Sequence, residues 1–416
     1  MSRKQIAALV GLAPYDFDSG KLRRARDRLL PLPIPQPGGS IELLKSYLNL
    51  PNPNDFVLVV TWLLATLRSE GPYPLLVISG EQGSAKTVLA KILKALVDPN
   101  AAPARALPRE DRDLFIAANN GHVLAFDNLS GLPAGLSDTF CRLASGGGFS
   151  VRQLYTDQDE VLFDAARPII LNGIEDFITR PDLGDRAIFL TLASIADANR
   201  RAERRLWRDF ATARPRILGA LLDAATHGLR RLPDESPTSL SRMADFVLWA
   251  AACETALWPA GTFARAYAAN RSAAVERLVE ADPVAACVQE MMAERNAWSG
   301  CATDLLRTQS ASNDVWKAVP GWPKNPRALA GRLRRVQTVL RSLGIVITFT
   351  RQGRAGTRII RISKSSEDTI RPDASAATMG VYKESTFYLE RRPSVMRADA
   401  ADAKCAMSPS NRQRPG

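Results

Sequence analysis

The sequence predicts an α/β domain with a parallel sheet, followed by an all-helical domain and a C-terminal winged helix. Short, almost continuously apolar runs alternate with helical stretches, as in strands that are covered on both faces of a parallel sheet. These runs are LLVIS (75–79), HVLAF (122–126), PIILN (168–172) and AIFLTL (187–192). From residue 196 to about residue 295, Ala, Leu, Arg and Trp recur at helical intervals instead. At 416 residues the chain is long enough for about two or three hydrophobic cores.

Changes in composition set the domain limits. Residues 1–28 end in the basic run KLRRARDR, and residues 29–55 begin with the proline-rich segment LPLPIPQPGG, which predicts an extended linker before a helix. The remaining predicted divisions are a sheet domain at 56–195, a helical domain at 196–295, a winged helix at 296–364 and a tail at 365–416. We expect prolines, Pro215 among them, to interrupt the helices. The tail is polar and rich in Ser, Ala and Asp, which predicts disorder.

The composition excludes several classes of protein. No apolar run approaches the roughly 20 residues that span a bilayer, so we expect no membrane segment. The five cysteines form no pair at metal-ligand or redox spacing, and the chain has only two histidines, which argues against a structural zinc site. Scattered reduced thiols predict a cytoplasmic protein.

The positive charge is concentrated near the C-terminal end. The net charge is +12, and twelve Lys or Arg residues with no Asp or Glu lie between Lys317 and Lys364. A basic excess confined to one segment indicates an anionic partner such as DNA.

A glycine-rich loop lies between the first predicted strand and a helical run. It reads GEQGSAKT and comprises Gly80, Glu81, Gln82, Gly83, Ser84, Ala85, Lys86 and Thr87. Its backbone amides and the start of the following helix predict a phosphate-binding loop, in which Lys86 meets the β and γ phosphates of ATP and Thr87 ligates Mg²⁺. Ala85 stands where glycine is usual, and we expect it to have a negative φ, as at a helix start. The alternative is a glycine-rich turn with a surface lysine.

A second apolar strand, HVLAFDN, ends in a carboxylate. Asp127 comes 41 residues after Lys86, which leaves room for a helix, another strand and a crossover before the chain returns beside the first strand. We expect Asp127 to hold the metal through water. Asn128 occupies the position where a glutamate would activate water, and an amide can orient water without taking its proton. Alternatively, Asp127 and Asn128 simply begin a turn.

The end of the third strand and the segment after it also carry polar side chains. Asn172 ends the third strand and is suited to sensing the γ-phosphate. Arg180 and Arg186 follow it, and an arginine there can stabilise transition-state charge in a neighbouring subunit. The alternative for each arginine is a local salt bridge to Asp182 or Asp185.

The ordered set GEQGSAKT, VLAFDN, IILN and RPDLGDRAIF resembles the AAA+ ATPases of bacterial prophages and mobile elements. These are related to superfamily 3 helicases and to the helicase half of primase-helicases. The resemblance covers about residues 30–363 and implies an AAA+ core, a helical lid and a hexameric ring around DNA. By match, it implies these roles: Lys86 and Thr87 as Walker A, Asp127 as Walker B, Asn172 as sensor 1 and Arg186 as the arginine finger. Arg216, in RPRILGALLDA, resembles a second sensor weakly.

The segment GGGFSVRQLYTDQDEVLF (146–163) alternates on both sides of residues 156–159, which predicts a β-hairpin. In superfamily 3 relatives such a hairpin grips DNA, which would give Arg152 and Tyr155 contacts with backbone and base. Alternatively, Tyr155 and Phe149 pack the hairpin onto the domain.

The basic segment predicts a helix followed by a hairpin. In GWPKNPRALAGRLRRVQTVLRSLG the leucines and valines share one face, and most arginines lie on the others. The candidate DNA-binding residues are Lys324, Arg327, Arg332, Arg334 and Arg335 on the helix, with Arg351, Arg354 and Arg358 on the hairpin. The alternative is a solvated cationic surface without a partner.

The N-terminus stands apart from the rest. Residues 1–27 resemble the C-terminal part of insertion-sequence transposases with a DEDD-type catalytic domain, in the elements AALVGLAP and DSGK. The alternative is a short amphipathic helix with a polar turn. Together, these observations favour an ATP-dependent motor that acts on DNA. An ATP-binding switch or loader with weak hydrolysis, and an inactive fusion product, remain open.

Overall fold

A computed structural model describes residues 29–365 apart from 148, 153–159, 164–165, 175–176, 179, 237–241, 313–318, 320 and 354–355. The transposase-like segment and the tail beyond residue 365 therefore lie outside the described residues. No described helix is long and apolar enough to cross a membrane.

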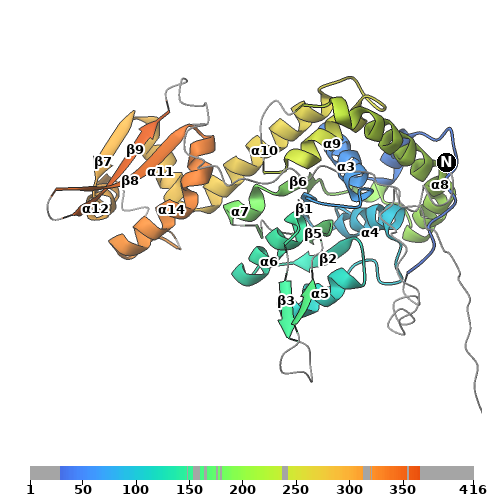
Figure 1. The fold of residues 1–416 in the computed structure, drawn as a ribbon, viewed down its shortest axis with the longest axis horizontal. Helices are drawn as coiled ribbons and strands as arrows, with labels where there is room; N and C mark the ends of the chain where they lie inside the picture. The colour runs from blue at the N-terminus through green and yellow to red at the C-terminus, as the bar shows by residue number, and fades with distance from the viewer. Residues whose placement is uncertain are drawn as a thin grey trace, which may run out of the picture. The chain divides into compact units, whose positions relative to one another are not determined.

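The four predicted strands are confirmed and form one parallel sheet (Figure 1). They are β1 (Leu75–Gly80), β2 (Leu124–Leu129), β5 (Ile169–Gly173) and β6 (Ala187–Leu192). Their order is β2-β5-β1-β6, so our expectation that β2 returns beside β1 is wrong. Nor does a further strand precede β2 in the described residues: Arg105 alone forms a bridge, to Phe126, because the surrounding segment is broken by prolines.

Alternate residues of β1 face opposite layers of helices, as a buried strand requires. Leu76 and Ile78 join a core with α3 (Pro53–Thr66) and α4 (Lys86–Val97). Leu75 and Val77 join a second core with α5 (Asp111–Asn119) and α6 (Ala134–Ser145). The sheet is therefore covered by helices on both faces, and this packing holds the strands whose ends carry the candidate site.

A buried polar network fixes the start of β2. The carboxylate of Asp98 accepts hydrogen bonds from Lys94 Nζ at 2.6 Å and from the backbone N–H groups of His122 and Val123. Burial lowers the pKa of His122, whose ring lies 2.7 Å from the carbonyl of Thr66. These contacts hold the strand that delivers Asp127.

The predicted helical region contains α8 (Glu203–Arg231), α9 (Ala244–Glu254), α10 (Thr262–Ala281) and α11 (Pro283–Ala293). The expected break at Pro215 is wrong, because α8 continues through it. Phe210, Phe246 and Phe263 pack in the same core as α3 and α4. The helices α8 to α10 thus complete the core of the sheet domain.

The proline-rich segment is held against α8. The N–H of Gln36 donates to the carbonyl of Pro215 at 3.0 Å. A Cβ on Gly219 would lie 1.9 Å from the carbonyl oxygen of Gln36. A Cβ on Gly39 would lie 1.9 Å from the carbonyl oxygen of Arg216. Only glycine permits these approaches. After this segment come the 3₁₀ helix η1 (Ile41–Tyr47) and then α3, whose first residue is Pro53.

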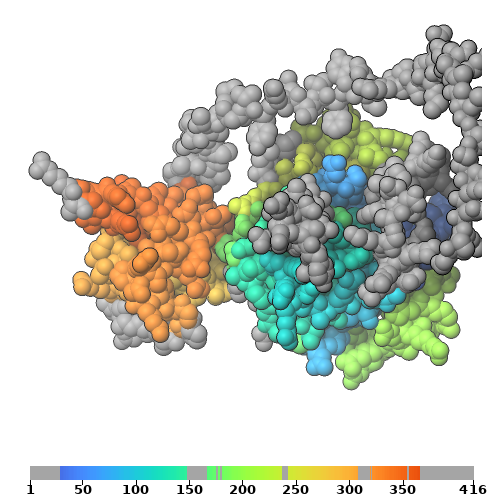
Figure 2. All heavy atoms as spheres, turned by 60° about the horizontal axis from the view of Figure 1, so that its bottom comes forward, coloured from blue at the N-terminus to red at the C-terminus, as the bar shows by residue number. Residues whose placement is uncertain are grey.

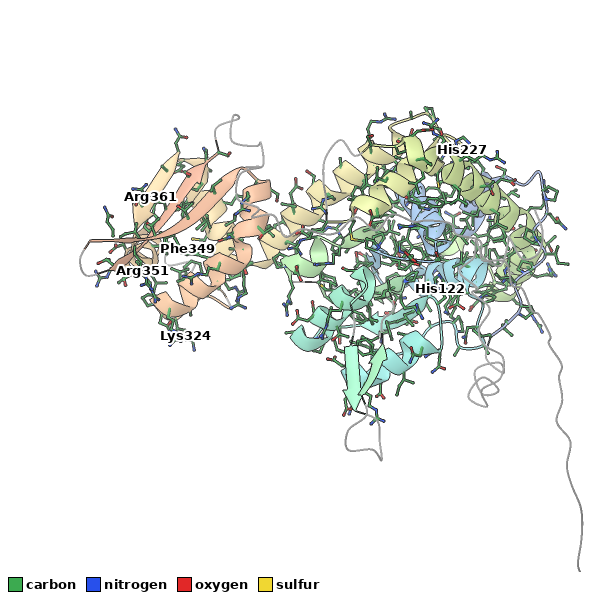
Figure 3. The ribbon with its side chains drawn as sticks, viewed as in Figure 1. His122, His227, Lys324, Phe349, Arg351 and Arg361 are labelled. Atoms are coloured by element: carbon green, nitrogen blue, oxygen red, sulfur yellow. The ribbon has the colours of Figure 1, made fainter. Side chains whose placement is uncertain are left out.

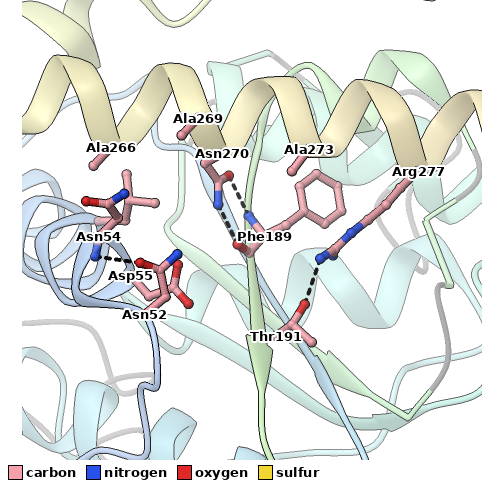
Figure 4. A pocket seen from close by; sticks show the side chains of 11 residues that line it. Asn52, Asn54, Asp55, Phe189, Thr191, Ala266, Ala269, Asn270, Ala273 and Arg277 are labelled. Atoms are coloured by element: carbon pink, nitrogen blue, oxygen red, sulfur yellow. Dashed lines mark hydrogen bonds between the residues drawn. The ribbon is translucent and has the colours of Figure 1, made fainter.

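The free edge of β6 faces α10 (Figure 4). The side-chain amide of Asn270 accepts from the N–H of Phe189 at 3.0 Å and donates to its carbonyl at 2.6 Å, as a neighbouring strand would. A cavity of about 210 Å³ lies beside this pair, between α3, β6 and α10. Asp55 and Arg277 line this cavity. Burial raises the pKa of Asp55 to about 6, and Arg277 donates a hydrogen bond to Thr191 Oγ1 at 2.8 Å.

The C-terminal segment forms a three-stranded antiparallel sheet with helices packed on it. Its strands are β7 (Ala297–Gly300), β8 (Ile345–Gln352) and β9 (Thr357–Lys364), in the order β7-β9-β8. The described helices are α12 (Ala302–Ser312) and α14 (Pro326–Ser342). The predicted leucine face of α14 is confirmed, because Leu329, Leu333 and Leu340 are buried. β7 was not predicted.

Candidate functional site

The glycine-rich loop connects β1 to α4, as predicted. Gly80 has a φ of 147°, and a Cβ there would lie 2.5 Å from the carbonyl oxygen of Leu192. Gly83 has a φ of 84°, which also favours glycine. Both glycines are therefore needed for the loop to bend close to β6. Glu81 and Gln82 are exposed, whereas Ser84 is buried and its hydroxyl donates to the carbonyl of Glu81 at 2.8 Å.

Ala85 departs from our expectation. Its φ of 66° and ψ of 29° place it in the left-handed region, so the predicted negative φ is wrong. The residue is the N-cap of α4 and makes no side-chain capping bond. A left-handed backbone explains why glycine is usual at this position, and it strains an alanine by about 1–2 kcal/mol.

The side chain of Lys86 folds across the loop. Its Nζ donates to the carbonyls of Gly80 and Glu81, each at 2.7 Å. Desolvation lowers the pKa of the ammonium, while the charge of Asp127 opposes that effect. The arrangement holds a positive charge at the loop that is predicted to bind phosphate.

Thr87 and Asp127 are brought together from α4 and β2. The hydroxyl of Thr87 donates to Asp127 Oδ1 at 3.0 Å. A hydroxyl and a carboxylate are hard oxygen ligands, and Mg²⁺ binds through a few such groups while it keeps several waters. The residues present therefore fit a magnesium ion.

Asn128 and Asn172 are linked across neighbouring strands. The N–H of Asn128 donates to Asn172 Oδ1 at 2.9 Å, at a point where the β2–β5 register is irregular. Asn128 has a φ of 59°, a conformation that asparagine tolerates better than most residues. Asn172 Nδ2 is buried and has no hydrogen-bond partner among the residues that the structure describes. A buried amide N–H group without a partner, next to the strand that carries Asp127, is suited to bind an anionic ligand.

Arg180 and Arg186 both have local partners. Arg186 contacts Asp182 Oδ1 at 2.9 Å and Ser145 Oγ at 3.1 Å, and its side chain is 19% exposed. Arg180 contacts Asp138 at 2.6 Å, and its side chain is 39% exposed. The local salt bridge that we considered for Arg186 is thus present, whereas Arg180 pairs with a different acid from those expected.

Arg216 is exposed on α8, and its backbone carbonyl lies against Gly39 of the proline-rich segment. No contact that we find in the described part of the chain joins it to the loop at 80–87. Arg200, by contrast, lies against Gly83, and the sequence analysis missed it. No motif spacing connects Arg200 with the loop, because only the turn after β6 brings it there.

The predicted hairpin between β2 and β5 is present. Strands β3 (Phe149–Arg152) and β4 (Glu160–Phe163) pair antiparallel, with Arg152 opposite Glu160. Tyr155 lies outside the described residues. The predicted DNA contacts of this hairpin therefore stay predictions.

The C-terminal segment is drawn in orange in Figure 2, and Figure 3 labels its Lys324, Arg351 and Phe349. Its basic residues differ in their surroundings. Arg332 is paired with Asp282 at 2.7 Å, and the guanidinium of Arg334 lies 4.5 Å from the ring centre of Phe349. Arg334 is nevertheless exposed, and so are the other described candidates, namely Lys324, Arg327, Arg335, Arg351 and Arg358. Arg354 lies outside the described residues. Exposed side chains from α14 and from both strands of the hairpin thus give this segment a cationic surface.

Comparison with known proteins gives a family match. The profile of actinomycete integrative conjugative element replication proteins (AICE RepA) matches residues 41–276, and that of the AICE RepA C-terminal domain matches residues 284–378. Neither match includes the transposase-like residues 1–27, so that resemblance has no support. A search of curated proteins found no match.

Two solved structures resemble this chain at low sequence identity. The apo C-terminal region of NrS-1 is 11% identical, with 80% of this chain and 77% of that chain covered and a TM-score of 0.37. A JCV helicase with a bound thiazolopyridine acetamide is 14% identical, with 54% of this chain and 62% of that chain covered and a TM-score of 0.27.

Proposed function

Because the chain belongs to the family of actinomycete integrative conjugative element replication proteins, we propose that it is an ATP-dependent motor acting on DNA during replication of such an element. The observation that carries the proposal is the contact between Thr87 Oγ1 and Asp127 Oδ1 at the end of the glycine-rich loop. A hydroxyl at a helix start and a carboxylate from a nearby strand are what a Mg²⁺-nucleotide site requires.

Each side chain has a role in this proposal. The amides at the start of α4 and Lys86 bind the phosphates, and Lys86 exchanges its carbonyl partners for phosphate oxygens. Thr87 and Asp127 hold Mg²⁺, which when bound neutralises charge on the β and γ phosphates. The orphan Nδ2 of Asn172 donates to the terminal phosphate, while its Oδ1 stays bonded to Asn128.

A neighbouring copy of the chain completes the site. We keep Arg186 as the residue that reaches the neighbour's phosphate, and Arg180, which is more exposed, as the second candidate. Arg186 must leave Asp182 and Ser145 to do so. A ring of copies around DNA, with six members as the AAA+ resemblance implies, would provide this geometry. Arg216 stays a candidate second sensor.

The C-terminal segment provides the DNA contacts. We assign it a winged-helix fold, in which α14 and the β8–β9 hairpin present the exposed arginines to phosphates. The pairing of β7 with β9 and the packing of α14 under the sheet support this assignment. The β3–β4 hairpin would add contacts through Arg152 and Tyr155.

Replacing Lys86 with Ala tests the nucleotide site. We expect loss of ATPase activity, because the positive charge at the loop is removed. Lys91→Ala, on the same helix, is the matched control and should keep its turnover. Steady-state ATPase rates on protein of known oligomeric state, with and without single-stranded DNA, measure this. Equal turnover in Lys86→Ala and the wild type would end the assignment.

One observation favours a second candidate, an ATP-binding switch or loader with weak hydrolysis. Asn128 stands where a general base is expected, and its amide cannot accept the proton of water. Its φ of 59° also disfavours the longer side chain of glutamate. Tight ATP binding with slow turnover that DNA does not stimulate would favour the switch, whereas DNA-stimulated turnover would favour the motor.

A further inference from the structure

The turn after β6 brings Arg200 to the glycine-rich loop. The short helix η2 (Asp197–Asn199) follows β6, and Arg200 is its C-terminal cap. Arg200 Nη2 lies 3.1 Å from the position that a Cβ on Gly83 would occupy. The guanidinium therefore touches the loop at a residue that has no side chain in its way.

Two of the three nitrogens of this guanidinium have partners outside the loop. Nε donates to the carbonyl of Ile195 at 3.3 Å, and Nη1 contacts Asp197 Oδ1 at 3.0 Å. Nη2 is the nitrogen that faces Gly83. A planar group fixed at two corners presents the third with a defined direction, which is how arginine recognises phosphate oxygens.

The segment that carries Arg200 is also fixed to the loop independently. Asn49 Nδ2 donates to the carbonyl of Ser84 at 3.1 Å and to that of Ala193 at 2.7 Å. The start of the turn and the loop therefore keep their relative position without Arg200. Removing the Arg200 side chain, which is 56% exposed, should leave this arrangement intact.

We propose that Arg200 binds the phosphate chain of the nucleotide from within the same subunit, on the opposite side of the loop from Asp127 and Asn172. The inference rests on the proposed nucleotide site. The placement follows from the sheet order, because β6 and the turn after it lie on one side of β1 while β5 and β2 lie on the other. Two cations, Lys86 and Arg200, would then hold the phosphates between them.

The test is equilibrium binding of ATP, ADP and AMP to the full chain in the presence of Mg²⁺, measured by calorimetry. The Arg200→Ala variant should bind ATP about 10- to 100-fold more weakly than the wild type, because it loses one charge-assisted hydrogen bond. AMP binding should change little, because the contact is to the phosphate chain. Arg204→Ala is the matched control, since Arg204 is exposed a few residues further on, and it should bind ATP as the wild type does.

The outcomes separate the two claims. If the wild type binds ATP, Lys86→Ala does not, and Arg200→Ala binds as the wild type does, the role of Arg200 is wrong while the nucleotide site stands. An equal loss for ATP and AMP would also overturn it, since that would indicate a contact with the nucleoside. If the wild type binds no ATP, both claims fall. Asp197→Asn, which frees Nη1, should weaken ATP binding less than Arg200→Ala does, and a thermal unfolding curve confirms that each variant is folded.

Discussion

Ala85 offers a direct measurement of strain in the glycine-rich loop. Its φ of 66° lies in the left-handed region, where an L-residue is less stable by about 1–2 kcal/mol. Replacing Ala85 with Gly removes this strain. Glycine is also a better N-cap than alanine, but it makes the unfolded chain more flexible, which costs about 0.4–1 kcal/mol. These two smaller effects nearly cancel, so we expect a net gain of about 1–2 kcal/mol.

Ala202 is the matched control, because it is the N-cap of α8 and also lacks a side-chain capping bond. Its φ of −61° carries no such strain, so Ala202→Gly should change stability little. Both helices contribute to one hydrophobic core, which makes their unfolding comparable. Urea unfolding without nucleotide, followed by tryptophan fluorescence, should give a higher midpoint for Ala85→Gly alone, with the same slope. Equal midpoints for the two variants would refute the argument from backbone strain.

Further predictions concern charged groups. Burial raises the pKa of Asp55 to about 6 from its usual 3.8, so the native state gains stability below pH 3.8 and loses it as the pH rises through 6. Asp55→Asn should therefore be more stable than the wild type at pH 8. Its advantage in free energy of unfolding should be up to about 3 kcal/mol larger at pH 8 than at pH 4, as measured by urea unfolding at both pH values. Lys94→Met leaves a buried carboxylate unpaired and should cost about 3 kcal/mol or more in the same assay, whereas Lys91→Met should cost little. In DNA-binding titrations, Arg335→Ala should weaken binding and reduce its salt dependence, because this side chain is exposed. Arg332→Ala should mainly lower stability, and a larger binding loss for Arg332 than for Arg335 would contradict this division.

The parallel sheet could be predicted because its strands are apolar on both faces. Leu75 and Leu76 point to opposite cores and are both buried, so the run has no polar alternation to confuse with a surface strand. The polar residues that end these strands, Asp127 and Asn172, were found for the same reason. The order of the strands in the sheet was not predicted, since the sequence of a strand does not indicate which strand lies beside it.

Other features depend on contacts between distant segments, which local patterns do not show. Helix α8 continues through Pro215, whose carbonyl accepts a hydrogen bond from Gln36. Strand β7 is short and has mixed burial, so that only its pairing with β9 defines it. The salt bridge of Arg332 with Asp282 joins residues 50 positions apart. Charge counting treated Arg332 as equivalent to its exposed neighbours for that reason.

The pairing of Asn270 with Phe189 bears on how copies of the chain can associate. An outer strand with unbonded amides can recruit a strand from another molecule and so extend the sheet without limit. Here the amide of one side chain occupies both backbone groups of Phe189. Extension of the sheet by a strand of another molecule is blocked at that residue, which protects the protein from open-ended aggregation there.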